Sequence, residues 1–477
     1  MRSPPVDPLL LQRAVDEALT RGASYAEARF HSVKHAGVLV VNGEPVSVTN
    51  TVTAGVAIRV VVKGGLGFAA TTSVSMDGVR AAVSRAVAAA RTSAAKMKRP
   101  VEMGPGRLGR ARYSVAPVKS FEDIPLDVKV GELVDLYRSV EKERDGFKVS
   151  NVVLSYTEAV EDKLIVNSDG AYVESSIPRI AVFYNIAATY EGRRANRWNT
   201  VGGSGGYELL EKLNLRGEVE DDVGSLYINL VKARSPPRGK MDVILGPEVI
   251  GLAVHESAGH PSEADRILGR EAAQAGMSFR TTYKDEYIGS EQVTVVDDPT
   301  IPSSYGFYLY DDEGVAAGPR VIYEKGRLAG MLHNRETAAV FGTESNAAAR
   351  AMDFNSEPIV RMANTYMKPG DYRFEELLEG VKEGVYIKKY MEWNIDDVRW
   401  GQRYVGLEAY VVRNGDLAEP VRDVALEITT RDLYSSIDAV GRDLRFFAGT
   451  CGKGEPPQGV PVWMGGPHVR LRGVRVG

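Results

Sequence analysis

The chain has 477 residues, of which 44% are hydrophobic and 26% are charged, so it has ample apolar surface for folded cores and is not a disordered chain. Lys and Arg (59) nearly balance Asp and Glu (63) for a net charge of −4, which argues against nucleic acid as the main partner. At roughly 150 residues per domain, the length predicts two or three domains and excludes one small module.

Cysteine content and the N-terminus bear on location. The single cysteine cannot form an internal disulfide, and the first residues offer only a three-leucine run before charges return, which is too short for a signal peptide. The charge-free stretch 45–58 is rich in Ser, Thr and Asn and falls short of the roughly 18 apolar residues that a membrane span needs. We therefore expect a cytoplasmic protein without a membrane segment.

The first hundred residues predict two helices and several strands. Apolar residues recur at helical spacing from Leu10 to Leu19, and Gly22 follows where a helix-ending glycine is expected. Strand patterns at 25–31, 37–41 and 55–62 could form an antiparallel meander. Ser75 can cap a second helix. The apolar stripe of that helix consists of Val79, Ala82, Val83, Ala86, Val87 and Ala90.

The next region predicts a third helix and a set of hairpins. The helix runs from about Asp123 through Leu136, and strand patterns follow at 149–160, 163–166 and 172–175 with a turn at 168–170. Four glycines lie within residues 202–206. They indicate either a flexible connection, which we favour, or a place where backbone approaches another group closely.

Residues 233–240 combine prolines, charges and a glycine, a composition typical of an exposed linker. We place the main boundary there, between an N-terminal domain at 1–235, possibly with subregions of about 1–115 and 116–235, and a C-terminal domain at 236–477. Beyond it the patterns predict a strand at 241–245, a helix that begins at Pro247, strands at 292–296, 320–324, 404–412 and 426–429, and a helix at 374–382.

These patterns together predict an α+β fold. The N-terminal domain is expected to be a mixed α/β region with antiparallel-rich sheets. The C-terminal domain is expected to be antiparallel and β-rich, and to carry the helix that begins at Pro247.

Two of the six histidines fall in the segment His255-Glu256-Ser257-Ala258-Gly259-His260. Neutral imidazoles are good zinc ligands, and a neighbouring carboxylate that does not bind the metal can take a proton from metal-bound water. The pattern therefore predicts a zinc site with Glu256 as the general base. The alternative is a helix that holds two histidines by chance.

The spacing of the two histidines does not suit a regular helix. Five residues correspond to ~500° of rotation, which leaves His255 and His260 about 140° apart. Gly259 tolerates a π-bulge, a kink or helix termination. Because Pro261 disfavours the helical region for the residue before it, we expect termination, with His260 extended just past the helix end.

A catalytic zinc generally has three protein ligands, so one is missing from this motif. The candidates are Cys451, His333, His468, Glu263 and Asp265. Cys451 lies between Gly449 and Gly452, which permit a tight loop around the thiol, but a lone cysteine is often a small buried hydrophobe. Chemistry alone leaves these two readings open.

The sequence alone does not assign a role to three further features. His468 follows a glycine-rich turn and could hydrogen-bond a ligand, although a structural role is commoner. For His333 we favour a structural role. The acidic turn Asp311-Asp312-Glu313 is read as a solvated loop, unless it lies near the metal and orients substrate or a ligand histidine.

Several longer motifs resemble the TldD/PmbA family of zinc metalloproteases, in particular its TldD branch. They are HESAGHPSEAD, DDEGVAAGPRVIYEKGRLAGML, TCGKGEPPQGVPVWMGGPHVRL and the upstream GVAIRVVVKGGLGFAATTSVSMDGVRAAVSRAV. The similarity covers nearly the whole chain. It implies that His255, His260 and Cys451 bind one zinc ion per chain and that Glu256 is the general base.

The resemblance also implies an activity and partners. Family members cleave unfolded polypeptides or short peptides, and the non-catalytic branch, TldE or PmbA, lacks the histidine–glutamate motif. We therefore expect a zinc-dependent peptidase that acts with a TldE-like paralogue or as a homodimer, without direct binding of nucleic acid or membrane. The alternative is a non-hydrolytic, zinc-stabilised regulatory or scaffold protein, against which Glu256 argues because a structural zinc does not need it.

Overall fold

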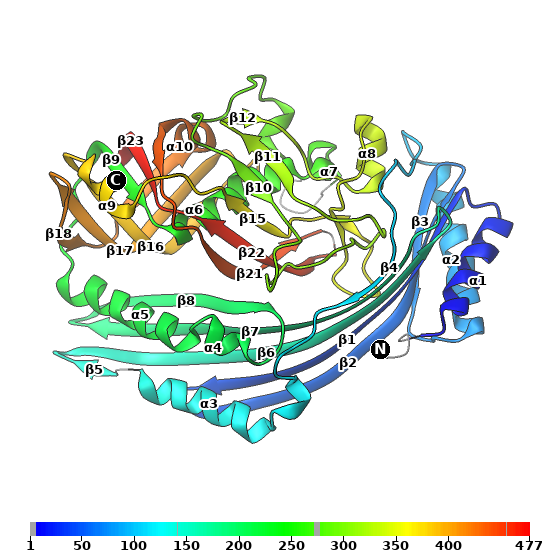
Figure 1. Ribbon diagram of the computed structural model, residues 1–477, viewed down its shortest axis with the longest axis horizontal. Coiled ribbons are helices and arrows are strands. Elements are labelled where there is room, and N and C mark those ends of the chain that lie inside the picture. The colour runs from blue at the N-terminus through cyan, green and yellow to red at the C-terminus, as the bar shows by residue number, and fades with distance from the viewer. Residues whose placement is uncertain (1–5, 141, 271–276, 455) are drawn as a thin grey trace.

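The computed structural model describes residues 6–140, 142–270, 277–454 and 456–477. One long, curved sheet forms the base of the molecule, and the C-terminal half lies on its concave side (Figure 1). Helices and largely antiparallel sheets occur in both halves, which confirms the predicted α+β class. None of the described helices is both long and apolar enough to cross a membrane.

The base is an eight-stranded sheet with the order β3-β2-β1-β6-β7-β4, in which β5 also pairs with β6 and β8 with β7. Because β1 pairs with β6 along most of its length, both predicted N-terminal subregions contribute to this single sheet. Its strands are β1 (Tyr25–Val41), β2 (Glu44–Val62), β3 (Gly65–Thr71), β4 (Arg110–Ser114), β5 (Glu143–Arg144), β6 (Phe147–Asn167), β7 (Tyr172–Tyr190) and β8 (Arg193–Ser204).

The strands are longer than the sequence pattern indicates. β1 joins two predicted strands, because the polar interval between them continues in extended conformation with both neighbours hydrogen-bonded. The glycines at 202–206 are not the flexible connection that we expected. Gly202 and Gly203 lie in β8 just before its end at Ser204, and a Cβ at Gly203 would lie 2.6 Å from the carbonyl oxygen of Ser303, so close approach explains them.

Helices pack on this sheet through the apolar stripes that the sequence predicts. The Ser75 hydroxyl accepts a hydrogen bond of 3.2 Å from the amide of Gly78, so it caps its helix as expected. All six residues of the predicted stripe are buried. The predicted helices are α1 (Pro8–Thr20), α2 (Met76–Ala94) and α3 (Leu126–Ser139), whereas α4 (Leu209–Lys212) and α5 (Leu215–Tyr227) were not predicted.

The C-terminal half contains two larger sheets and a two-stranded one. The seven-stranded sheet comprises β9 (Gly239–Leu245), β16 (Glu383–Ile395), β17 (Gly401–Arg413), β18 (Asp416–Val421), β19 (Ala425–Thr429), β20 (Ile437–Val440) and β23 (Val469–Val476). The six-stranded sheet comprises β10 (Val295–Asp297), β11 (Arg320–Glu324), β12 (Arg327–Leu328), β15 (Asn364–Met367), β21 (Arg445–Lys453) and β22 (Gln458–Gly466). The remaining pair is β13 (Ala349–Arg350) and β14 (Ile359–Val360).

One helix links the two larger sheets. α6 (Pro247–Val254) begins at Pro247, as predicted, and its apolar residues join the core that both sheets share. The other helices are α7 (Ala264–Ile267), α8 (Arg335–Phe341), α9 (Phe374–Glu379) and α10 (Thr430–Ser436). The boundary at residues 235 and 236 stays a prediction.

Buried ion pairs join the base sheet to the C-terminal half. Arg59 of β2 contacts Glu313 at 2.7 Å, and Lys163 of β6 contacts Asp312 at 2.9 Å. Asp311 accepts a hydrogen bond of 2.9 Å from the amide of Val315. The reading of the acidic turn as a solvated loop is therefore wrong, because its three carboxylates have partners away from water.

Candidate metal centre

The segment that carries the two histidines continues α6 in altered helical forms. A π-helical turn covers His255–Gly259, and a 3-10 turn covers His260–Ser262. The amide of His260 donates to the carbonyl of His255, so residues five positions apart lie above one another. This turn brings the imidazoles together, with ring centroids 5.0 Å apart.

The expected extended conformation of His260 is therefore wrong, since its φ and ψ are −54° and −46°. Pro261 lies in the first turn of the 3-10 helix, where its missing N–H is tolerated, and tertiary packing overrides its local effect on His260. The chain becomes extended only at Glu263. Gly259 supplies the room for this turn, because a Cβ there would lie 1.9 Å from Sδ of Met362.

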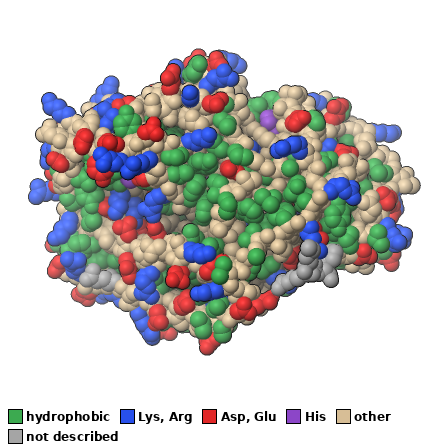
Figure 2. Space-filling model, in the orientation of Figure 1, with side chains coloured by type: hydrophobic (Ala, Val, Ile, Leu, Met, Phe, Trp, Pro, Cys, Tyr) green, Lys and Arg blue, Asp and Glu red, His purple; other side chains and the backbone are tan. Residues whose placement is uncertain are grey.

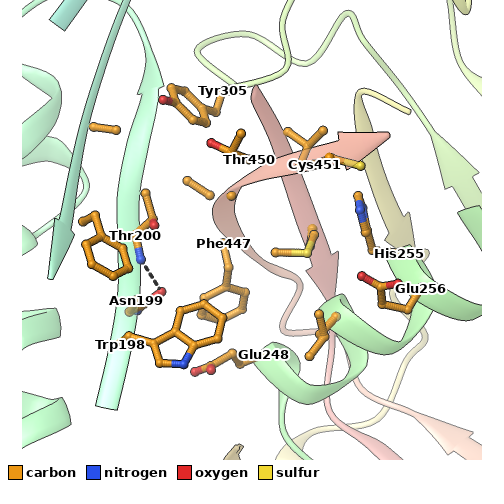
Figure 3. Close-up of a pocket in the computed structure, with 18 of the residues that line it drawn as sticks. Trp198, Asn199, Thr200, Glu248, His255, Glu256, Tyr305, Phe447, Thr450 and Cys451 are labelled. Atoms are coloured by element: carbon orange, nitrogen blue, oxygen red, sulfur yellow. Dashed lines mark hydrogen bonds between the residues drawn. The ribbon is translucent and has the colours of Figure 1, made fainter. Parts of the chain in front are cut away.

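Cys451 completes a cluster with the two histidines. Its Sγ lies 3.5 Å from Nε2 of His260, and ligand atoms of His255, His260 and Cys451 all lie within 4.8 Å of one another. Figure 3 shows Cys451 on β21 facing the helix of His255 and Glu256. A tetrahedral zinc with bonds of about 2.3 Å to sulfur and 2.05 Å to nitrogen would place these atoms about 3.6 Å apart.

The donor set therefore fits a zinc ion. Among the described residues, Nδ1 of His255 is buried without a hydrogen-bond partner, which is costly unless a ligand uses its lone pair or proton. The three side chains form a site that could hold a metal.

Charged groups behind the cluster orient His260. Glu263 accepts a hydrogen bond from Nδ1 of His260 at 3.0 Å, leaving Nε2 free to face Cys451. Arg266 and Lys453 lie 3.1 Å and 3.3 Å from the same carboxylate oxygen. Lys453 also contacts Asp265 at 2.6 Å. Glu263 and Asp265, both candidates for the third ligand, thus lie outside the cluster and support it.

Electrostatics favours the protonation states that a metal requires. Burial lowers the pKa values of His255 and His260, so both imidazoles are neutral near pH 7. Burial alone would raise the pKa of the Cys451 thiol, but His260 and Arg361 lower that pKa to about 7. A thiolate beside neutral imidazoles is the form that binds a metal.

Glu256 lies beside the cluster and is paired with an arginine. Its Oε2 is 2.5 Å from Nη1 of Arg399, and both side chains are 8% exposed. Arg399 lies in the connection from β16 to β17 with a φ of 65°, and its carbonyl accepts the hydroxyl of Thr430 at 2.7 Å. Sequence reasoning missed Arg399, because no motif marks this position.

The cluster opens into a cavity of about 610 Å³ between the two halves of the molecule. In Figure 3, Trp198 and Thr200 of β8 lie across this cavity from His255, and Phe447 lies between the two walls. On the outer surface, hydrophobic side chains gather in the middle of the face over this boundary, whereas charged side chains of both signs lie mostly around it (Figure 2).

Two further histidines that were considered lie outside the cluster. Nε2 of His468 is 2.8 Å from the Tyr386 hydroxyl, and its Nδ1 is bonded to Asp443. Nδ1 of His333 is 3.2 Å from the hydroxyl of Thr337, and burial lowers the pKa of His333 to about 4. Both rings therefore have structural contacts.

Comparison with protein families covers most of the chain. The model of the PmbA/TldA metallopeptidase C-terminal domain matches residues 238–477, which include all four predicted site residues. The chain belongs to the PmbA/TldA metallopeptidase family. Models of domain 1 and of the central domain of the same family match residues 26–90 and 121–230. The resemblance inferred from the sequence motifs is thereby confirmed.

Individual PmbA/TldA relatives support this assignment. A metalloprotease of Methanothermobacter thermautotrophicus is 34% identical over 95% of each chain. A zinc metalloprotease TldD homolog of Saccharolobus solfataricus is 34% identical over 52% of this chain and 54% of its own. The crystal structure of TldE from Thermococcus kodakarensis shares the fold, with a TM-score of 0.75, 16% identity, and coverage of 98% of this chain and 99% of that one.

Proposed function

We propose that this chain is a zinc-dependent peptidase that hydrolyses unfolded polypeptides or short peptides. The observation that carries the proposal is the meeting of His255, His260 and Cys451 beside Glu256 at the wall of a cavity. Three clustered protein donors leave a fourth tetrahedral position for water or substrate, whereas a purely structural zinc is generally closed by four.

In this proposal, His255, His260 and Cys451 hold one zinc ion per chain. Zinc supplies a Lewis acid that polarises a carbonyl group and makes water more acidic. Glu256 accepts the proton of the attacking water and then donates a proton to the departing amine, as a general base and acid. Arg399 fixes the carboxylate of Glu256 at the cavity wall through their 2.5 Å contact.

The walls of the cavity suit an extended peptide. β21 is the terminal strand of its sheet, and residues from Phe447 to Gly452 line the cavity. A substrate strand can pair with this edge through main-chain hydrogen bonds, which depend little on side-chain identity. Aromatic side chains such as Phe183, Trp198 and Phe447 offer apolar contact to its side chains.

We also infer that a second chain of the same fold associates with this one, either a TldE-like paralogue or another copy. The shared fold with TldE of Thermococcus kodakarensis supports this inference.

Metal removal and restoration test the proposed activity. We expect the purified chain, alone or with a TldE-like paralogue, to cleave denatured casein or short peptides, to lose this activity with a zinc chelator, and to regain it with added zinc. A chain that binds zinc stoichiometrically but cleaves neither substrate in either setting would instead support the non-hydrolytic scaffold.

A further inference from the structure

Two neighbouring residues, Arg361 and Met362, connect the two parts of the metal centre. Sδ of Met362 lies against Gly259 in the π-helical turn, where an added Cβ would come within 1.9 Å of it. Nη2 of Arg361 donates a hydrogen bond to the main-chain carbonyl of Cys451. This short segment therefore contacts both the turn that carries His260 and the strand that carries the thiol.

The end of β21 that presents Cys451 has few side chains to hold it in place. Gly452 follows the cysteine and pairs with Gly459 across the hairpin of β21 and β22. Because glycine allows the backbone more conformations than other residues, this end needs an anchor if the thiol is to stay in one position. Nη1 of Arg361 donates at 2.9 Å to the carbonyl of Gln458 on β22. The guanidinium thus ties both strands of the hairpin.

The charge of Arg361 does not suit a role in packing alone. The side chain is fully buried. Among the described residues its hydrogen bonds go only to main-chain carbonyls, it forms no ion pair with a carboxylate, and its Nε has no hydrogen-bond partner. A guanidinium keeps its charge in a protein interior, so an apolar side chain would fill this space at lower cost. In the zinc-bound form proposed above, the thiolate of Cys451 would supply an opposite charge.

We propose that Arg361 is a positioning residue of the metal centre, which holds the main chain of Cys451 so that the thiol faces His260. The planar fork of a guanidinium suits this task, because it can bond two carbonyls at once in a fixed geometry, which a lysine cannot. Arg361 does not line the cavity, so it acts through Cys451 and not on a substrate. The inference rests on the metal binding of the proposed function and not on peptide hydrolysis.

Zinc affinity tests this role. Arg361→Met removes the charge and both hydrogen bonds at similar length. We expect its zinc dissociation constant, measured by competition with a zinc-sensitive dye, to rise by about 10- to 100-fold, as is typical when a group that supports a metal ligand is lost. Arg361→Lys keeps the charge without the fork and should raise the constant by a smaller factor. If the methionine variant does not fold, the lysine variant decides.

Arg350→Met is the matched control. Arg350 is also buried and forms no ion pair with a carboxylate among the described residues. Its guanidinium donates at 2.7 Å and 2.9 Å to the carbonyls of Met362 and Pro461, so it contacts the same hairpin but not Cys451. This variant should keep the zinc affinity of the wild type, whatever its effect on stability. Unchanged affinity in the Arg361 variants, or an equal loss in Arg350→Met, would overturn the proposal.

Cobalt substitution reports on the sulfur directly. The thiolate-to-cobalt absorption band depends on the geometry of Cys451 at the metal, so it should shift or weaken in Arg361→Lys and match the wild type in Arg350→Met. A band that is the same in all three proteins would contradict positioning by Arg361. A wild-type chain that binds no zinc would overturn both this inference and the proposed function, whereas zinc binding without cleavage would count against the peptidase alone.

Discussion

Sγ of Cys451 lies 3.5 Å from Nε2 of His260, although 191 positions separate the two residues in the sequence. The contact depends on tertiary structure at both ends. β21 presents the thiol from the edge of one sheet, and the π-helical turn after α6 presents the imidazole. Changes at either end should therefore affect the same measurable property, the bound metal.

Loss of the thiol should empty the site. We expect Cys451→Ala to reduce bound zinc from about one ion per chain to near zero, because two imidazoles alone hold zinc weakly. Elemental analysis after gel filtration measures this. Gly452→Ala is the control, since a Cβ at Gly452 meets nothing within 4 Å. Stoichiometric zinc in the alanine variant would remove Cys451 from the ligand set.

Glu256 should be needed for turnover and not for the metal. Replacing Glu256 with Gln keeps the size of the side chain but removes the base, so we expect peptide hydrolysis to fall by about 10²- to 10⁴-fold with zinc content unchanged. Steady-state kinetics and elemental analysis of the same preparation separate the two effects. Glu291→Gln, at an exposed position, should behave as wild type. Near-normal cleavage by Glu256→Gln would reject the assignment.

The carboxylate behind His260 should tune metal affinity. We expect Glu263→Gln to weaken zinc binding by about 10- to 100-fold, because Glu263 fixes the orientation of the imidazole of His260, which we propose as a zinc ligand. Competition with a zinc-sensitive dye measures the dissociation constant. Asp265→Asn is the matched control, because Asp265 contacts Lys453 and not the imidazole. Equal affinities of the two variants would show that the hydrogen bond does not matter for the metal.

His333 should make the fold sensitive to acid. Burial lowers the pKa of His333 to about 4, whereas an unfolded histidine titrates near 6.5. Between these values the unfolded chain binds more protons, so the contribution of His333 to stability is present above pH 6.5 and is lost as the pH falls toward 4. This loss amounts to about 2 to 3 kcal/mol at pH 4.5.

Substitution of this histidine isolates that effect. In urea unfolding near pH 7 and near pH 4.5, His333→Gln should show a smaller loss of unfolding free energy on acidification than the wild type. His35→Gln, within β1 between β2 and β6, serves as the histidine control. An unchanged pH dependence in His333→Gln would assign the acid sensitivity to other groups.

Space beside Gly259 should decide whether the π-helical turn forms. In Gly259→Ala the new Cβ would lie 1.9 Å from Sδ of Met362, which is fully buried. We expect a loss of about 1 to 3 kcal/mol of stability from overpacking, with reduced zinc content. The double variant with Met362→Ala makes room and should recover zinc. Full zinc in the single variant would show that Met362 can move aside without cost.

Local sequence signals predicted much of the fold. The cap at Ser75 and the stripe from Val79 to Ala90 are short-range features, and both are confirmed. Strand lengths were underestimated, because the polar residues between the two predicted parts of β1 are extended by pairing with β2 and β6 rather than by their own preference. A local sequence pattern does not indicate pairing with strands that are distant in the sequence.

The candidate site shows the same limit. The motif indicated His255, Glu256 and His260, and the family resemblance added Cys451. The extended conformation predicted for His260 was wrong, because packing around Gly259 outweighs the local effect of Pro261. The pairing of Arg399 with Glu256 spans 143 positions, and nothing in the sequence around either residue marks it.

The buried arginines of the base sheet bear on how a peptide could reach the cavity. Arg197 of β8 donates two hydrogen bonds, of 2.7 Å and 2.8 Å, to Glu248 in the first turn of α6. Arg59 forms an ion pair with Glu313 farther along the sheet. Separation of the two halves would break these ion pairs and the packing around them. We therefore expect the two halves to stay together while a peptide enters the cavity.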